Sequence, residues 1–428
     1  MRKLILTAVC IAVSCSVTYA TGARVGSLAG ASSYLLDDSQ VYAWPCRMPL
    51  FYRTLIAELG TDGQRISSNS SVAGIYADQE QTFGAIGLAA NRATAAQQLL
   101  SDYLEHTYTV GTVSVEANII ERLNQRGLGA GLRELPVPQR GIELLYAKRF
   151  GDWTPGLRIE RAAAENSQSI TGQSATATSS ATGLTLSAGY DPSDALKADL
   201  GLDLASFSFS SGLAIDATGA RQTFESKGSL LVAFHGRAFY ALNDEMNLVP
   251  RLAIEYGNLG YGYTQSDTLR AAEGKTTATG FTLGAGWQYA PAAKYTVVAG
   301  LEIAYRSVKT ADSVIVTDPG DVKRTETSWD LPALHLGLEY QAAKWLIIRM
   351  GGSKRLSSVR TVIDFSDQTS LTTDASNDSY QLGMGAGFKM GNLLLDVMVN
   401  PELLYSGGNI VSGSKTWPVS QASVLYRF

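Results

Sequence analysis

The sequence predicts an all-β protein, a transmembrane antiparallel β-barrel, and three observations support this fold class. Segments of about ten residues alternate apolar and polar side chains through most of the chain, as strands that cross a bilayer in a barrel do. Very short connections alternate with long ones rich in Ser, Thr, Asp and Gly. The chain ends on the alternating sequence VLYRF. We predict 14 strands, with 16 as the alternative.

The composition excludes two other classes of protein. The 428 residues include 45% hydrophobic and 17% charged side chains. After residue 20, no apolar run reaches the roughly 20 residues that a membrane-spanning helix needs, so a polytopic helical protein is excluded. The hydrophobic content is too high for a disordered chain. A water-soluble β-sandwich would also alternate, but we would expect Lys and Glu along its polar face and short loops at both ends.

Residues 1–20 have the three parts of a secretory signal. Arg2 and Lys3 precede an apolar stretch over 4–17, and small residues lead to a cleavage site after Ala20. The alternatives are a buried N-terminal helix and a lipoprotein anchored at Cys15. Cleavage after Ala20 leaves Cys46 as the one cysteine. It also leaves 33 basic against 39 acidic side chains, a net charge of −6, which argues against a nucleic-acid partner.

The alternation is clearest in the middle of the chain. In residues 229–242, Leu230, Val232 and Phe234 share one face, whereas His235 and Arg237 lie on the other. The same pattern recurs in 196–207, 247–258, 295–307 and 380–388. One face of each strand is therefore expected to meet lipid and the other to meet the lumen.

The connections differ in length between the two ends of the predicted barrel. The expected tight turns are 78–81, 151–153, 191–194, 243–245, 291–293, 341–343 and 391. The expected long polar loops are 61–70, 91–139, 164–181, 208–228, 259–277, 308–328, 356–378 and 405–418. Short periplasmic turns with longer extracellular loops are typical of outer-membrane barrels. The predicted location is therefore the cell outer membrane, with outer-membrane lipids and lipopolysaccharide as partners.

The last segment, residues 419–428, predicts a strand that ends in an assembly signal. Tyr426 and Phe428 resemble the C-terminal signal that the barrel-assembly machinery recognises. Because both termini should be periplasmic, the strand number is even: 16 if 52–60 and 71–77 are strands, 14 if they belong to the N-terminal region. Aromatic residues beside the short turns predict an interfacial belt: Tyr146, Tyr190, Tyr240, Tyr289, Tyr295, Tyr340, Trp345 and Tyr426.

Charged residues of both signs are expected to line the lumen. The main set is Arg237, Arg251, Glu255, Glu302, Arg306, Glu339 and Arg349. These residues form either a structural network of salt bridges or part of a substrate path. Glycines within the strands, among them Gly280, Gly284, Gly286 and Gly383 to Gly387, mark either kinks and gaps or tight packing against an N-terminal plug.

Residues 21–51 do not alternate like a strand. A Gly/Ala-rich stretch over 26–33, the acidic pair Asp37 and Asp38, and Tyr42-Ala43-Trp44-Pro45 follow one another. This order resembles the FadL/PorV-like superfamily, in which Asn and Ala flank the Pro at the positions that Trp44 and Cys46 occupy in this chain. The resemblance implies a 14-stranded barrel, 52–428, with 21–51 as a plug in which Asp37, Asp38, Trp44 and Pro45 take part in gating. It implies uptake of hydrophobic compounds in one branch and a secretion-accessory role in the other.

The long segment 91–139 carries apolar residues at helical spacing over 93–106 and again over 115–123. Strand parity places this segment outside the cell. Helical outer loops of the resembled family form a first site for apolar ligands, which implies ligand capture by Leu99, Leu100, Tyr103 and Leu104. The alternative is a helical cap that packs on the rim of the barrel.

No motif in the sequence predicts an enzyme. The three His are scattered, no Gly-x-Ser-x-Gly elbow is present, and no cluster has the spacing of metal ligands, so we expect no metal and no cofactor. Acidic side chains in the outer loops, such as Asp312, Asp318 and Asp321, are expected to be solvated. We therefore expect a channel for passive uptake of small, hydrophobic molecules. The alternative is a non-enzymatic surface scaffold or secretion-accessory barrel.

Overall fold

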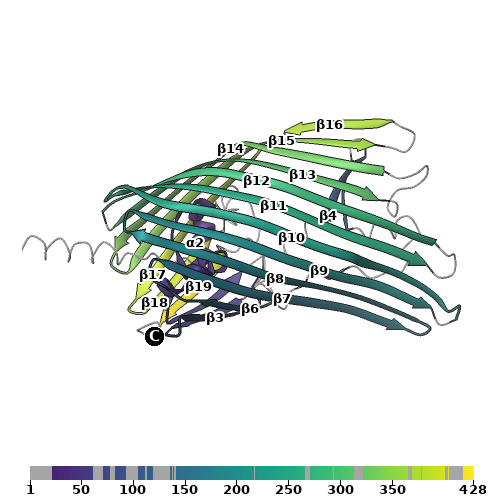
Figure 1. Cartoon of the computed structure of the whole chain (residues 1–428), viewed down its shortest axis with the longest axis horizontal. Helices are drawn as coiled ribbons and strands as arrows, with labels where there is room; N and C mark the ends of the chain where they lie inside the picture. Colours follow the sequence, from purple (N-terminus) through teal and green to yellow (C-terminus); the bar gives the residue numbers. More distant parts are fainter. Residues whose placement is uncertain are drawn as a thin grey trace, which may run out of the picture.

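The computed structural model is a closed antiparallel β-barrel (Figure 1). It describes residues 22–60, 71–77, 82–92, 105–110, 113–118, 135–136, 138, 141–215, 217–265, 270–292, 294–312, 322–364, 369–376, 378–400, 403 and 418–428. Sixteen strand positions form the wall, and β1 closes it by pairing with both β2 and β19. The count of 14 is therefore wrong, because the two weakly alternating segments near 54–60 and 71–77 are both hydrogen-bonded strands.

Within the described residues, four short helices precede the strands. The N-terminal segment contains the α-helix α2 (Gly22–Ser27) and the 3-10 helices η1 (Ala31–Tyr34), η2 (Asp38–Tyr42) and η3 (Pro45–Phe51). The strands are β1 (Thr54–Gly60), β2 (Ser71–Ala77), β3 (Ala85–Ala90), β4 (Glu105–Val110), β5 (Val113–Asn118), β6 (Ile142–Ala147), β7 (Trp153–Ile170), β8 (Gln173–Ser193), β9 (Leu196–Ile215), β10 (Ala220–Asn243), β11 (Met246–Gln265), β12 (Arg270–Ala292), β13 (Tyr295–Asp312), β14 (Val322–Ala343), β15 (Leu346–Asp364), β16 (Ser370–Ser376), β17 (Ser379–Met390), β18 (Leu393–Val399) and β19 (Val419–Arg427).

The barrel wall is long on one side and short on the other. Strands β7 to β15 have 18–24 residues, whereas β1, β2, β3 and β6 have only six or seven. Strands β16 and β17 share one position in the wall. β17 pairs with the half of β15 nearer the short turns, and β16 pairs with the half farther from them. A bilayer crossing needs about 9–11 residues, so the long strands extend well beyond it.

Five of the expected loops are largely strand. Residues 164–181, for example, form the end of β7 and the start of β8, with only Thr171 and Gly172 between the two strands. Residues 208–228, 259–277, 308–328 and 356–378 likewise contain paired strand ends. Their Ser and Thr residues are compatible with ladder pairing. The expected loops at 61–70 and 405–417 lie outside the described residues.

The tight turns are confirmed at six of the seven expected places, and the seventh, 78–81, lies outside the described residues. Two-residue connections join β8 to β9, β10 to β11, β14 to β15 and β17 to β18. The C-terminus lies at this same end, where the Phe428 N–H donates to the Arg53 carbonyl. The barrel therefore has a short-turn end and an outer end with longer strands.

The outer face carries an apolar band between two levels of aromatic side chains. Near the short turns, Tyr295 stacks on Tyr340 with ring centroids 5.1 Å apart. Farther along the same strands, Phe281, Tyr305 and Trp329 form a ladder across β12, β13 and β14, with adjacent centroids 5.7 and 4.7 Å apart. The ten residues from Tyr295 to Tyr305, at about 3.3 Å each and tilted by about 40°, give a height of about 25 Å, the thickness of a membrane barrel's apolar band.

The helical prediction for part of 91–139 is wrong. Strands β4 and β5 form a separate antiparallel hairpin over residues expected to be helical at 105–106 and 115–118. The sequences Thr107-Tyr108-Thr109-Val110 and Val113-Ser114-Val115 are rich in β-branched residues, which favour strands. Residues 93–104, with Leu99, Leu100, Tyr103 and Leu104, lie outside the described residues. None of the helices in the described part of the chain is long and apolar enough to cross a membrane.

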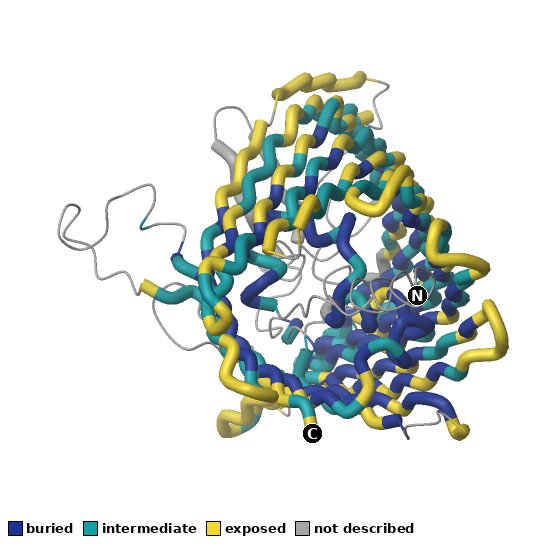
Figure 2. Tube along the Cα trace, turned by 90° about the vertical axis from the view of Figure 1, so that its left-hand side faces the viewer, coloured by how far each residue is buried: buried dark blue, intermediate teal, exposed yellow. Residues whose placement is uncertain are grey.

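The N-terminal segment, residues 22–51, lies against the inner face of the barrel. It packs on β6, β7 and β8 through η3 and on β15, β17, β18 and β19 through α2. Figure 2, seen from the short-turn end, shows the strands as a ring with buried segments inside it. Two buried apolar clusters join the segment to the wall, one around Met48 and Phe51 and the other around Leu28 and Tyr34.

Candidate functional site

A row of glycines on the inner wall accommodates the first half of the N-terminal segment. A methyl carbon added at Gly286 or Gly300 would lie within 3.0 Å of the Tyr34 ring. One at Gly351 would meet the Leu28 backbone, and one at Gly383 would meet the Gly26 carbonyl. These glycines lie on strands β12, β13, β15 and β17 of the same side of the wall. Of the two interpretations of the strand glycines, close packing against the segment accounts for these positions.

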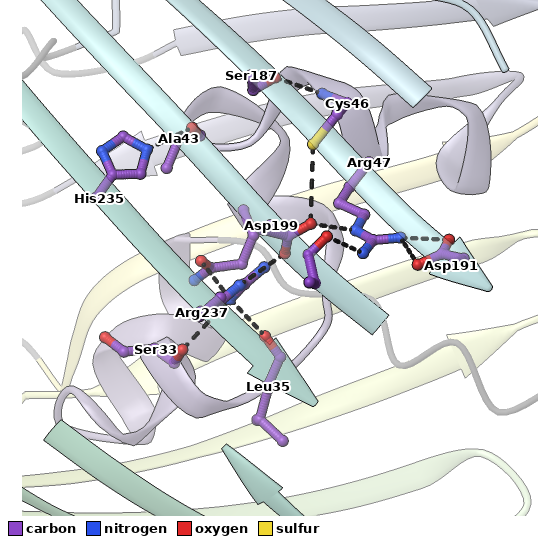
Figure 3. Close-up of polar contacts among 12 residues, drawn as sticks. Ser33, Leu35, Ala43, Cys46, Arg47, Ser187, Asp191, Asp199, His235 and Arg237 are labelled. Atoms are coloured by element: carbon purple, nitrogen blue, oxygen red, sulfur yellow. Dashed lines mark hydrogen bonds and ion pairs between the residues drawn. The ribbon is translucent and has the colours of Figure 1, made fainter. Parts of the chain in front are cut away.

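Two buried arginines share Asp199 at the second half of the segment (Figure 3). Arg47 of η3 donates from Nε to Asp199 at 2.5 Å and also pairs with Asp191 at 2.6 Å. Arg237 of β10 donates from Nε to the other Asp199 oxygen at 2.9 Å. Its Nη1 reaches the carbonyls of Ser33 and Leu35. Asp199 thus connects the segment to two strands of the wall.

A second buried ion-pair network holds α2. Arg24 donates from Nε to Glu339 at 2.7 Å and lies 3.6 Å from Asp37. Arg349 donates to the same Glu339 oxygen at 2.7 Å and pairs with Asp396. All these side chains are less than a tenth exposed. A buried ion that loses its partner costs several kcal/mol, so this network strongly favours one position of the segment.

Tyr34 forms the third polar attachment. Its hydroxyl donates to Glu302 at 2.7 Å, and Arg251 pairs with the same carboxylate oxygen at 2.8 Å. His335 lies 3.7 Å from the other oxygen of Glu302. Burial, and then the hydrogen bond to Glu302, raise the pKa of Tyr34 well above its usual value. Tyr34 is therefore a neutral donor at any physiological pH.

The four expected plug residues all lie in the segment. The Asp37 and Asp38 side chains are fully buried, and Asp37 faces Arg24. Trp44 packs edge-on against His235 with centroids 4.3 Å apart and lies 5.0 Å below the Arg237 guanidinium. Pro45 begins η3, and its carbonyl carbon lies where a side chain at Gly156 would project. A role of these residues in gating stays a prediction.

The seven expected lumen residues all have partners on the inner side of the barrel. Five of them belong to the networks described above: Arg237, Arg251, Glu302, Glu339 and Arg349. Glu255 and Arg306 pair with each other at 3.3 Å and are about a third exposed. The two assembly-signal residues, Tyr426 and Phe428, are about half exposed at the short-turn end. Recognition by an assembly machinery stays a prediction.

Sequence reasoning did not single out Arg24, Arg47, Asp191 or Asp396 as part of this site. The available signal was two arginines in an N-terminal segment that does not alternate like a strand. Because buried charges need partners, those two residues required carboxylates on the wall. The sequence does not specify which of the many inward carboxylates meet them, since the pairs are separated by up to 315 residues along the chain.

A buried apolar patch lies on the inner face toward the outer end of the long strands. It contains aromatic side chains from three neighbouring strands together with Leu135 of the long 91–139 segment: Phe207, Phe209, Phe224, Tyr261 and Tyr263. The rings of Phe209 and Phe224 stack 5.3 Å apart. The Ser179 hydroxyl donates to the Pro136 carbonyl, which fixes the 135–136 stretch beside the patch. This part of the inner wall is apolar, whereas Glu255 and Arg306 lie closer to the N-terminal segment.

The reactivity of the Cys46 thiol can be used to test whether the N-terminal segment is buried against the wall. Its thiol is buried, its N–H donates to the Ser187 hydroxyl at 2.9 Å, and burial together with Asp199 raises its pKa to about 12. A thiol must ionise to react. We expect alkylation by a maleimide at pH 8 to be at least about 100-fold slower in the folded barrel than in the unfolded chain. Mass spectrometry of timed samples would measure it; equal rates would contradict the buried position.

Among the described residues, no three His, Cys, Asp or Glu side chains are grouped as metal ligands would be. The polar groups of the site are instead arranged as ion pairs and hydrogen bonds between the N-terminal segment and the wall. The arrangement can hold or release a segment of the chain.

Comparison with known proteins gave structural likeness only. The chain matches no protein-family model and no curated protein sequence. It is similar to a solved FadL homologue from Pseudomonas aeruginosa, with 11% identity, a TM-score of 0.46, and coverage of 95% of this chain and 98% of that one. For the toluene transporter TodX from Pseudomonas putida these values are 10%, 0.37, 95% and 96%. For the ferric yersiniabactin uptake receptor FyuA from Yersinia pestis they are 10%, 0.36, 88% and 79%.

Proposed function

We propose that the protein is an outer-membrane channel for the passive uptake of small hydrophobic molecules, with residues 22–51 as its gate. The observation that carries this proposal is the inward-facing aromatic patch in a closed barrel of membrane height. The proposal rests on this inner wall and not on the structural likenesses.

The chemistry of the inner wall favours an apolar solute. A water-filled porin has a polar interior, but here Phe207, Phe209 and Phe224 point inward from β9 and β10. These aromatic side chains are at most 3% exposed, so a solute would reach them only by displacing the groups packed on them. An apolar molecule bound there would gain about 25 cal/mol for each Å² of its own apolar area that becomes buried. A hydrated ion gains nothing there. The patch therefore supports selection of hydrophobic molecules before they reach the N-terminal segment.

The contacts of the N-terminal segment support the proposal that this segment is the gate. Its ion pairs with Glu339 and Asp199 hold it against the inner wall, and as a gate it would lie between the aromatic patch and the short-turn end. Passage would require these contacts to open in part. The same contacts also favour the second candidate, a scaffold or secretion-accessory barrel that never opens, because buried networks of this kind strongly oppose movement.

The test is conductance in planar bilayers, comparing the intact protein with a variant that lacks residues 22–51. We expect the intact protein to show little ionic current and the deletion variant to show large, ohmic steps. Liposome uptake of the apolar fluorophore N-phenyl-1-naphthylamine should be seen with the intact protein and should fall when Phe209 and Phe224 are replaced by Ser. If neither ionic current nor fluorophore uptake is seen with the intact protein or with any variant, the scaffold is favoured.

A further inference from the structure

Three lysines lie on the outward face of the barrel above the aromatic ladder. Lys275 of β12 and Lys309 of β13 have the same strand parity as the outward-facing Phe281 and Tyr305, with unbroken pairing between the two strands. Lys323 of β14 has the parity of Trp329, whose ring packs on Tyr305 on that same face. All three side chains are exposed. They therefore point away from the lumen.

The pairing register brings the three lysines together. Lys275 lies opposite Ala311, and Lys309 lies opposite Thr277, so the two lysines are diagonal neighbours. Lys323 lies opposite Ala311 and is the diagonal neighbour of Lys309 on the next strand. Diagonal neighbours on one face of a sheet are about 7–8 Å apart. The three ammonium groups can therefore approach one anionic group from adjacent strands.

The charges of the three lysines are not satisfied within the described part of the chain, where none of them forms an ion pair or hydrogen bond. Of the nearby acids, Glu273 accepts from Lys227 at 2.5 Å. Asp364 lies opposite Lys323 in the ladder between β14 and β15 and offsets part of the positive charge, and it accepts from Ser370 at 2.8 Å. On β15, Arg360 is already paired with Asp374. Three unpaired like charges on adjacent strands repel one another, and the chain as a whole is negative. An anion at this place would relieve the repulsion.

The position of the three lysines along the barrel axis indicates which kind of anion they would bind. The lysines lie four to six residues beyond the ladder of Phe281, Tyr305 and Trp329, or about 10–15 Å along the barrel axis. Aromatic belts mark the boundary of the hydrocarbon region, so the cluster lies at the level of lipid head groups. Clusters of basic side chains at that level attract anionic lipids.

We propose that Lys275, Lys309 and Lys323 form a binding site for the phosphate groups of an outer-leaflet glycolipid of the lipid A type. The site is on the lipid-facing wall and is separate from the lumen. It rests on the outer-membrane location in the proposed function, but it does not depend on whether the channel opens. A bound glycolipid would fix the barrel's height in the membrane and strengthen the rim where the long strands leave the bilayer.

The experiment is native mass spectrometry of the full-length protein titrated with bisphosphorylated lipid A in detergent. The test variant is Lys275→Gln/Lys309→Gln/Lys323→Gln. The matched control is Lys294→Gln/Lys344→Gln/Lys389→Gln, which removes three exposed lysines beside the short turns at the opposite end. We expect at least about tenfold weaker binding in the test variant, and affinity within about twofold of wild type in the control.

Further measurements distinguish lipid phosphate from free phosphate and show whether a variant has misfolded. Dephosphorylated lipid A should bind at least about tenfold more weakly to the wild type, and millimolar inorganic phosphate should not displace lipid A. The variant Lys309→Arg, which keeps the charge, should bind as the wild type does. Equal binding by test variant and wild type would overturn the site, as would displacement by inorganic phosphate. Bilayer conductance of the variant lacking 22–51 tests the channel separately.

Discussion

Replacement of Asp199 by Asn is expected to lower the free energy of unfolding by about 3–5 kcal/mol, because the buried Arg237 loses its ion-pair partner and Arg47 keeps only Asp191. Asp199 is fully buried and accepts from Arg47 and Arg237, whose side chains are 1–2% exposed. Burial by itself would lower the pKa of Arg47, but Asp199 and Asp191 raise it, so the guanidinium remains charged. Asn keeps the shape of Asp but removes the charge.

The same change should loosen the N-terminal segment, because Arg47 and Cys46 are adjacent and both contact Asp199. We therefore expect a lower melting temperature and faster alkylation of Cys46 in Asp199→Asn. The matched control is Asp374→Asn, which removes an ion pair with Arg360 in which both side chains are exposed; exposed pairs contribute little. A melting temperature and alkylation rate equal to those of wild type would show that Asp199 does not anchor the segment.

The double substitution Gly286→Ala/Gly300→Ala is expected to displace Tyr34 and the chain around it. Added methyl carbons at both positions would lie within 3.0 Å of the Tyr34 ring, and that ring is fully buried. Overpacking of this kind typically costs about 1–3 kcal/mol. Because Tyr34 also donates to Glu302, we expect a lower melting temperature and, from the proposed gating role of residues 22–51, an ionic leak current through the barrel.

The control for this prediction is Gly212→Ala, where the added carbon would meet only the Gln222 carbonyl at 3.8 Å, an ordinary contact. It should be neutral or slightly stabilising. The effect of the double substitution should also shrink when Tyr34 is replaced by Ala, since the clash is then absent. If the penalty is the same with and without Tyr34, the glycines do not serve to accommodate that ring.

The strands could be predicted because a barrel wall has one apolar and one polar face. In β10 and β13 the alternation was unambiguous, and the short turns followed from it. The strand ends were misjudged for the same reason. The outer parts of β7 and β8 consist mainly of Ser, Thr and Ala, whose small side chains give a weak contrast between the two faces, so they resemble loops in sequence. Only their pairing with neighbouring strands shows that they continue the wall.

The segment 91–139 shows a different limit. Apolar residues at intervals of three and four are compatible with a helix, but β-branched residues and a partner strand favour a hairpin. A short segment carries too little of either signal to decide. In the described part of this segment, pairing of β4 with β5 decides the outcome.

The sequence by itself determined the barrel, its two ends, the even number of strands and the inward orientation of the lumen charges, because each follows from local periodicity and connection length. Only the tertiary structure decided that the wall closes with 16 strands, that Asp199 and Glu339 are the partners of Arg47 and Arg24, and that Gly286 and Gly300 make room for Tyr34. Such partners are far apart along the chain. Closure of the barrel brings them together, and no local pattern encodes which inward side chains will then lie within hydrogen-bond distance.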